Sequence, residues 1–243
     1  MTTTLTIIRY PKRYIFFALL AMMIHRFPLW LNGNIVFFKL MGSGKNGSFD
    51  KNPDWQQWAI LSVTKSRFKA IQLKNFTEEI VHQKLLGSFI RKWLAFFKCQ
   101  TITYLLTPIE GHGRWDGKTV FGDLPAKTDY EGRIAVLTRA TIRLTKLSSF
   151  WSNVGPVAAQ MQGAEGLVTS YGIGEIPFIK QATFSIWDSK EAMKSFAYQM
   201  QAHKNVVQQT RKQNWYSEEM FVRFIINGAI GSINGINLLK GKL

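Results

Sequence analysis

One histidine, His203, lies on the apolar face of a predicted helix. Whether its imidazole binds a metal decides whether the chain can be an enzyme of that kind. Residues 190–213 are predicted as a single amphipathic helix, because apolar residues recur every three or four positions along one stripe. An imidazole on such a stripe is either a hydrogen-bonded core group or a ligand for a metal such as a haem iron. Taken alone, a lone helical histidine is more often a core group. The stripe consists of Met193, Phe196, Met200, His203 and Val207.

The other three histidines form no zinc or non-haem iron motif with nearby carboxylates. We expect His25 at a helix end, His82 on the surface of a partly polar helix, and His112 in a glycine-rich loop from which it could reach a cavity. One histidine suffices to hold a haem from one side, so a haem is not excluded. Cys99 is the only cysteine, which rules out an internal disulfide and indicates a reducing, cytoplasmic compartment. We interpret it as an inert structural thiol.

Two glycine motifs and one acidic pair have ordinary explanations. Gly42-Ser43-Gly44 and Gly172-Ile173-Gly174 do not lead directly into helices, as a dinucleotide motif must, so we expect turns at strand ends. Glu218 and Glu219 are adjacent and therefore point apart; we expect them on a solvated face or paired with Arg211 or Arg223. No serine stands in a nucleophile elbow.

The chain has 243 residues and a net charge of +16, which favours polyanionic partners such as nucleic acid or anionic lipid. The basic residues are scattered, and this is weak support for a nucleic-acid arm.

Residues 14–24 are continuously apolar but fall short of the ~20 residues that cross a bilayer. We expect a helix buried in the core; the alternative is an interfacial helix over residues 14–30 that rests on a membrane.

The elements predicted along the chain repeat once, in the order β-α-β-β-α-β. The fold class predicted is therefore α+β, with two fused ferredoxin-like repeats that form a dimeric α+β-barrel type of domain. The first half covers residues 1–124 and the second covers 133–243. Residues 108–125 form the connection, and we expect 110–117 to be a loop, because this segment is too polar for a buried strand. The predicted strands are 3–9, 35–41, 58–64, 101–107, 134–143, 167–171, 182–187 and 220–226, and the helices are 11–30, 76–97, 150–161 and 190–213.

Several segments resemble the spheroidene monooxygenases, also called acyclic carotenoid 2-ketolases. The resemblance covers nearly the whole chain and is densest between Ile134 and Phe224. The segments are AVLTRATI (135–142) with Phe150-Trp151, GIGEIP (172–177) with QATFSIW (181–187), FAY (196–198) with His203, and WYSEEMF (215–221) with Arg223-Phe224; KLMGSG (39–44) and GRWDG (113–117) add to them in the first half.

This resemblance implies a haem b enzyme whose iron is held by His203, and it reverses the preference for a core histidine. It implies a monooxygenase that inserts oxygen at a terminal methylene of an acyclic carotenoid or a similar long apolar substrate. A second hydroxylation at the same carbon would give a gem-diol, which loses water to leave a ketone. Arg139, Arg143 and Arg211 are candidates for pairing with haem propionates or for polar catalytic groups. The expected cofactor-binding residues are His203, Phe184, Trp187, Phe196, Met200, Val207 and Trp215. For the four aromatic residues among them, packing in the core is an equally good explanation.

The implied partners follow from this chemistry. We expect an electron donor such as a ferredoxin, peripheral contact with the inner face of a membrane, no nucleic acid, and a homo-oligomer. Two alternatives stay open. One is a haem-binding α+β barrel with different chemistry, such as dehydration or a peroxidase-like reaction, because fold does not settle function. The other is a non-catalytic basic protein that binds membrane or nucleic acid.

Overall fold

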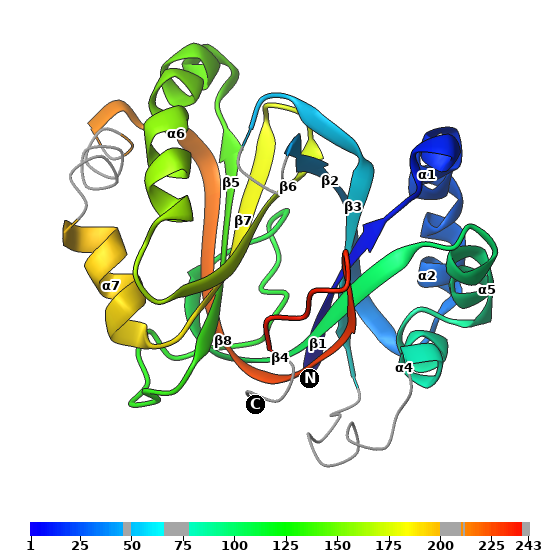
Figure 1. Ribbon diagram of the computed structural model, residues 1–243. Helices are drawn as coiled ribbons and strands as arrows, with labels where there is room; N and C mark the ends of the chain where they lie inside the picture. The colour runs from blue at the N-terminus through cyan, green and yellow to red at the C-terminus, as the bar shows by residue number, and fades with distance from the viewer. Residues whose placement is uncertain (46–49, 66–77, 200–209, 211, 240–243) are drawn as a thin grey trace. The chain divides into compact units, whose positions relative to one another are not determined.

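The computed structural model describes every residue except 46–49, 66–77, 200–209, 211 and 240–243 (Figure 1). The chain divides into two compact units. Unit 1 consists of Met1–Gly42, Asp54–Thr107 and Ile226–Leu243, and unit 2 of Ser43–Pro53 and Pro108–Ile225. The long strands β4 (Gln100–Gly113) and β8 (Tyr216–Ser232) run through both units.

Unit 1 contains a four-stranded sheet with the order β4-β1-β3-β2. Strand β1 pairs antiparallel with both β3 and β4, so that Leu5 lies opposite Leu61 on one side and Tyr104 on the other. The strands carry alternating side chains, and nearly all of β1 is buried on both faces. The strands are β1 (Thr2–Arg9), β2 (Ile35–Gly44), β3 (Pro53–Thr64) and β4.

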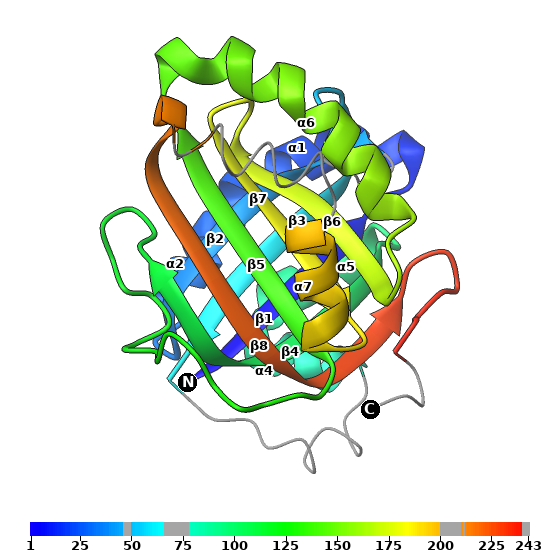
Figure 2. The same ribbon diagram turned by 90° about the vertical axis from the view of Figure 1, so that its left-hand side faces the viewer.

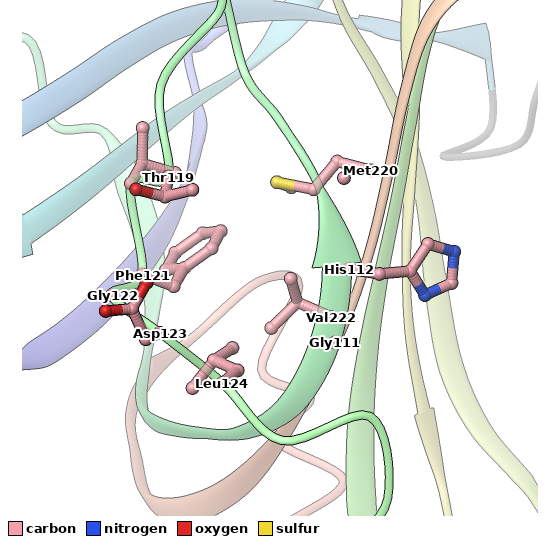
Figure 3. A pocket seen from close by; sticks show the side chains of 11 residues that line it. Gly111, His112, Thr119, Phe121, Gly122, Asp123, Leu124, Met220 and Val222 are labelled. Carbon is pink, nitrogen blue, oxygen red and sulfur yellow. The ribbon is translucent and has the colours of Figure 1, made fainter.

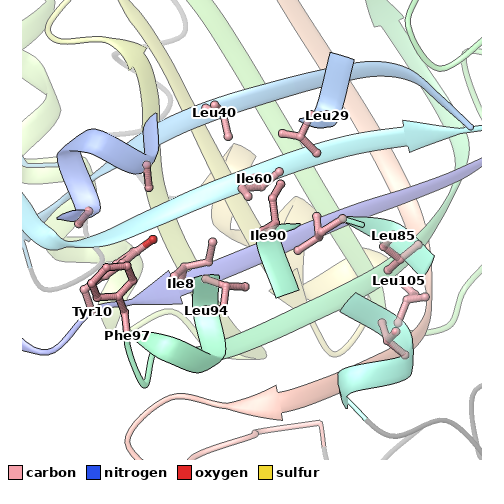
Figure 4. Packing of buried hydrophobic residues seen from close by; sticks show 14 residues of the cluster. Ile8, Tyr10, Leu29, Leu40, Ile60, Leu85, Ile90, Leu94, Phe97 and Leu105 are labelled. Atoms are coloured by element: carbon pink, nitrogen blue, oxygen red, sulfur yellow. The ribbon is translucent and has the colours of Figure 1, made fainter. Parts of the chain in front are cut away.

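The helices of unit 1 lie on one side of its sheet (Figure 1). They bury their inner stripes against Ile8 of β1, Ile60 of β3 and Leu105 of β4, and Leu29 and Ile90 are the helix residues at the centre of this core (Figure 4). The helices are α1 (Ile15–Ile24), α2 (Arg26–Leu31), α4 (Glu78–Leu85) and α5 (Ser88–Phe96), and a 3-10 turn over Lys12–Tyr14 precedes α1.

Unit 2 repeats this arrangement with the order β8-β5-β7-β6. Each unit therefore has the chain order β-α-β-β-α-β and the same sheet order, and the predicted α+β fold with two fused ferredoxin-like repeats is confirmed. The boundaries 1–124 and 133–243 stay a prediction. The elements of unit 2 are β5 (Ile134–Ile142), a 3-10 turn over Leu144–Lys146, α6 (Leu147–Gln162), β6 (Leu167–Ile176), β7 (Lys180–Trp187), α7 (Lys190–Gln199) and β8.

The two Gly-x-Gly motifs do not form turns at strand ends. Strand β2 continues through Gly44, and β6 continues through Gly174 to Ile176. In unit 2 the Ser43 hydroxyl donates a hydrogen bond to the carbonyl of Gly172, at 3.1 Å. The glycines of both motifs have none of the positive φ angles that occur at other glycines of the described chain. The expectation of turns was wrong because residues without side chains are also compatible with paired strands.

Strand β4 extends through Glu110 to Gly113, where we expected a loop. The polarity of this segment was misleading because the carboxylate of Glu110, although fully buried, is neutralised by Lys190 and Arg223. A buried charge is tolerated in a strand when it is paired and hydrogen-bonded. Gly111 also fits this strand for a steric reason, since a Cβ there would lie 2.6 Å from the carbonyl oxygen of Phe221.

Helix α1 is not buried in the core as we expected. Only Ala18 and Ala21 are buried, whereas Phe16, Leu19 and Met23 are exposed. The apolar helical stretch is also longer than the predicted residues 14–24, because α2 continues it beyond His25. The helical segment Lys12–Leu31 spans 20 residues with a mean hydropathy of 1.6, which by length and composition is enough to cross a membrane.

Two histidines are buried in unit 1. His25 lies at the junction of α1 and α2, as expected, with its ring edge-on to Trp93 at 5.4 Å and its Nε2 atom without a hydrogen-bond partner. His82 is also buried, against expectation, and its Nε2 lies 3.3 Å from the hydroxyl of Thr103. Burial lowers the pKa of His25 to about 4 and also lowers that of His82.

These histidines make stability depend on pH. The folded state keeps His25 neutral while the unfolded state binds a proton below the ordinary histidine pKa, so stability falls as the pH drops through that range. From a shift of this size we expect a loss of about 2 kcal/mol between about pH 7 and about pH 5. Urea unfolding at both pH values measures it. His25→Gln should lose most of this dependence, and the exposed-site control His112→Gln should keep it; an equal dependence in both variants would contradict the assignment.

Candidate functional site

The face of the unit 2 sheet that α6 and α7 cover is packed at both of its ends. Helix α7 buries Met193 and Phe196 against Ile134 and Val136 of β5. The ring of Phe196 lies over that of Trp187, with 5.3 Å between the centroids. Because side chains alternate along a strand, Thr138 of β5 points to this same face and Arg139 to the opposite one.

The other end of this face is closed by an aromatic cluster at the start of α6. Phe150 and Trp151 pack with Ile142 and with Trp215, which immediately precedes β8. The rings of Phe150 and Trp215 meet edge to face at 6.0 Å. The two clusters therefore fix α6 and α7 over opposite ends of the sheet, and Figure 2 shows both helices on this side of it.

Between the clusters, the described side chains leave part of this sheet face accessible at Thr138. Thr138 is exposed although β5 is flanked by strands on both sides. Its direct neighbours across the sheet are Thr183 of β7 and Phe221 of β8, both half-buried, and Gly172 of β6 lies next to Thr183. We call these four residues the open row. It spans three interstrand spacings, about 14 Å, and within it Thr138 is the exposed residue while Gly172 is buried.

His112 of β4 borders the open row. Its exposed imidazole stacks on the ring of Phe221, with 5.8 Å between the centroids. The guanidinium of Arg223 lies over the same ring, at 4.7 Å. The open row thus ends in an aromatic side chain with a nitrogen base beside it and a cation over it.

On the opposite face, a small pocket of about 220 Å³ lies beneath the loop that follows β4. Phe121, Leu124, Met220 and Val222 give it apolar walls, and the imidazole of His112 is directed away from it (Figure 3). His112 therefore lines this pocket through its backbone only. The volume is below the ~300–1,000 Å³ that is usual for small-molecule sites.

Arg139 is buried on this opposite face among carboxylates. Its guanidinium donates to Glu218, and to Asp116 at 3.2 Å; the carboxylate of Glu175 lies 3.7 Å away. Glu218 is half-buried and pairs with Arg139, not with Arg223 as one of our alternatives had it, whereas Glu219 is exposed, as expected for a solvated face. The other alternative, Arg211, lies outside the described residues. Burial raises the pKa of Glu218, but the amides of Gly117 and Asp116 together with Arg139 outweigh burial and lower it.

A second buried charge cluster surrounds Glu110. Its carboxylate accepts bonds from the Thr128 amide at 2.7 Å, from the Thr128 hydroxyl at 2.8 Å and from Lys190 Nζ at 2.8 Å, and Arg223 completes the set. Lys190 also donates to the Thr128 carbonyl, at 2.7 Å. Lys190 is the first residue of α7, so this cluster anchors that helix to the end of β4.

The residues predicted for the cofactor site are only partly brought together. Trp187 and Phe196 meet beneath α7, Trp215 belongs to the aromatic cluster at α6, and Phe184 lies on the face of Arg139. Four predicted residues lie outside the described part of the chain: Met200, His203, Val207 and Arg211. All these assignments stay predictions.

No sequence pattern indicated the open row, because Thr138, Thr183 and Phe221 become neighbours only through the strand register. Within the described ranges, no three His, Cys, Asp or Glu side chains gather where they could hold a metal ion. A group held by a single ligand does not need such a cluster.

Solved structures with the same fold define the class. An aldoxime dehydratase crystallised with butyraldoxime matches with a TM-score of 0.63 at 10% identity, over 98% of this chain and 84% of its own. A second aldoxime dehydratase structure gives a TM-score of 0.61 at 9% identity, over 98% of this chain and 86% of its own. The expected fold class, an α+β protein of the dimeric α+β-barrel type, is confirmed by these matches.

The family follows from sequence. The chain is 42% identical to the spheroidene monooxygenase of Rubrivivax gelatinosus over 191 residues, which cover 78% of this chain and 68% of that protein. It is 31% identical to that of Rhodobacter capsulatus over 225 residues, covering 91% and 88%. The chain belongs to the spheroidene monooxygenase family, and the predicted family and oxidoreductase class are confirmed.

A third relative is longer. The spheroidene monooxygenase of Cereibacter sphaeroides is 32% identical over 200 residues, which cover 82% of this chain and 58% of that protein. The chain thus spans less than two thirds of this relative. No family model matches the chain.

Proposed function

We propose that the protein is a haem b-dependent monooxygenase that oxidises a terminal methylene of an acyclic carotenoid or a similar long apolar substrate. Its similarity to spheroidene monooxygenases, at 31–42% identity, carries the proposal. The haem would supply the activation of O2. In this proposal His203 holds the iron and Arg211 pairs with a propionate or serves as a polar catalytic group. The same role predicted for Arg139 competes with a structural one, because its side chain lies on the face opposite the open row among carboxylates.

The open row supports the haem assignment. Gly172, Thr183 and Thr138 present little side-chain volume, so a flat ring can approach the sheet, and the ring of Phe221 offers an edge on which it can rest. Trp187 and Phe196 close one end of this area and exclude water there. The segment with His203 follows α7 directly in the chain. The chain's own role would be to hold, orient and shield the cofactor.

The ligand assignment is tested by the absorption spectrum of the purified protein. We expect a Soret band, and we expect His203→Ala to abolish it or to cut the haem content more than tenfold, because the one protein bond to the iron is lost. His112→Ala is the matched control, since this imidazole borders the open row and should not ligate the iron. Loss of haem in His112→Ala with retention in His203→Ala would transfer the ligand role to His112. An unchanged spectrum in both variants would overturn the proposed site.

The reaction is tested in a host that makes acyclic carotenoids. Extracts from cells with the protein should contain a carotenoid that has gained a keto group, and extracts with His203→Ala should not. An aldoxime assay serves as a parallel test of the alternative, dehydratase chemistry, since fold likeness alone does not select between the two. Nitrile formation without a change in the carotenoids would favour that alternative.

The proposed partners follow from the substrate. A monooxygenase needs electrons, for which we propose a donor such as a ferredoxin. Carotenoids dissolve in lipid, so we propose a cytoplasmic enzyme in peripheral contact with the inner membrane face, acting as a homo-oligomer and without nucleic acid. The net charge of +16 supports attraction to anionic lipid.

A further inference from the structure

The helices of unit 1 present apolar side chains on both sides. The buried side of α1 and α2 carries Ala18, Ala21, His25 and Leu29, whose spacing follows the helical repeat. The opposite side is also apolar, yet it is exposed: Met23 is 73% exposed and Trp30 is 72% exposed. Only 22% of the most apolar 18-residue stretch of this helical segment is buried. A helix that is apolar all round is normally buried in a protein core or in lipid, so the exposed side lacks the environment that its residues favour.

The exposed side continues onto α5. A chain of ring contacts runs from Phe16 through Phe17 and Phe97 to Phe96, with centroid distances of 5.7, 4.7 and 5.0 Å. Phe96 itself is 77% exposed. Figure 1 shows α1, α2 and α5 together on the side of unit 1 away from its sheet. We call this surface the apolar face; it consists of Phe16, Leu19, Met23, Phe27, Trp30, Phe89 and Phe96. Contiguous exposed apolar patches mark sites of interaction.

The sequence segments that form the apolar face carry positive charges and no negative ones. No Asp or Glu occurs between Met1 and Phe49 or between Ile80 and Ile109, which include α1, α2 and α5. The exposed basic residues of these helices and their ends are Lys12, Arg13, Arg26, Lys92 and Lys98. An apolar surface with a basic rim complements a bilayer that carries anionic lipid, where each basic side chain strengthens binding by about fivefold. A second copy of this face would instead oppose like charges.

We infer that the apolar face rests on an anionic lipid bilayer, with α1 and α2 lying in the interface. Helices of this kind insert their apolar side about 5–10 Å, to the boundary between headgroups and acyl chains, and the indole of Trp30 suits that boundary. The inference deepens the proposed function by naming the surface through which the enzyme meets its membrane-dissolved substrate. Lipid binding itself can be measured without haem or carotenoid.

Flotation of the purified 243-residue protein with vesicles tests the inference. We expect binding to vesicles of phosphatidylcholine and phosphatidylglycerol in equal parts, weaker binding in high salt, and little binding to phosphatidylcholine alone. The triple variant Met23→Gln, Phe27→Gln, Trp30→Gln should lose about a hundredfold of its vesicle affinity, since three large apolar groups no longer enter the lipid. These side chains are exposed, so circular dichroism should show an unchanged fold.

The matched control replaces two equally exposed apolar residues outside the face, Leu144→Gln and Ile236→Gln, and should bind as the wild type does. Equal binding by wild type and triple variant would overturn the inference. If the wild type does not bind vesicles but forms dimers, and the triple variant is monomeric, the apolar face joins two copies of the chain and the inference is overturned. Retention in cell membranes after an alkaline carbonate wash would indicate a spanning helix and would also overturn it. None of these outcomes alters the haem spectrum, so failure here and failure of the proposed function are distinguishable.

Discussion

Replacing Glu110 with alanine is expected to lower the free energy of unfolding by about 3–5 kcal/mol, because it leaves a buried cation without its partner. Glu110 is fully buried, and the side chain of Lys190 is only 4% exposed. Without the carboxylate, Lys190 keeps its bond to the Thr128 carbonyl among the contacts of the described residues, and the amide of Thr128 loses the Glu110 acceptor. Burial already lowers the pKa of Arg223, which shows how poorly this position solvates a charge. Urea unfolding measures the effect.

Two further variants test whether the loss of stability comes from the buried carboxylate. Glu110→Gln retains an acceptor for Thr128 but removes the charge, so its loss should be smaller than that of Glu110→Ala. Asp129→Ala removes an exposed carboxylate from the neighbouring loop and should change stability by less than about 0.5 kcal/mol. If Glu110→Ala and Asp129→Ala unfold at the same urea concentration, the cluster does not stabilise unit 2.

Much of the fold could be predicted from the sequence because it depends on local periodicity. The segment around Ile134 alternates as a strand does, and Met193 and Phe196 recur as on a helix; both are confirmed, with Ile134, Met193 and Phe196 in one cluster. The repeat of β-α-β-β-α-β was visible for the same reason. Local pattern also gave the position of His25 at a helix end.

The errors occurred where distant partners decide the outcome. Glu110 is buried in a strand only because Lys190, 80 residues later, neutralises it, and no local pattern shows such a pair. His82 is buried because Thr103 of another element lies beside it. Helix α1 was placed in the core by its hydrophobicity, but hydrophobicity does not reveal whether protein or lipid covers a surface. The open row likewise depends on strand register, which sequence spacing leaves undetermined.

Arg139→Met is expected to destabilise the protein by about 3–5 kcal/mol, because it removes the cation that neutralises a group of carboxylates. The guanidinium is 1% exposed, and the side chains of Glu175 and Asp116 are 12% and 34% exposed. Lys180 would still neutralise Asp116, at 2.6 Å. The Trp115 indole would still donate to Glu175, at 2.7 Å, but Glu175 would lose the nearby charge of Arg139. Since Arg139 lowers the pKa of Glu218, the deficit should be largest near neutral pH and should shrink as the pH falls and the carboxylates take up protons.

Haem content separates this structural role from the propionate-binding role also proposed for Arg139. Arg139→Lys keeps the charge but cannot reach several carboxylates at once, so it should lose less stability than Arg139→Met. Arg114→Met removes an exposed arginine of the adjoining loop and should be neutral within about 0.5 kcal/mol. If the role of Arg139 is structural, Arg139→Met should have a lower free energy of unfolding than the wild type. The protein that remains folded should then contain as much haem as the wild type. Unchanged stability together with lost haem would instead place Arg139 at the cofactor, and would show that its position opposite α7 does not keep it from the site.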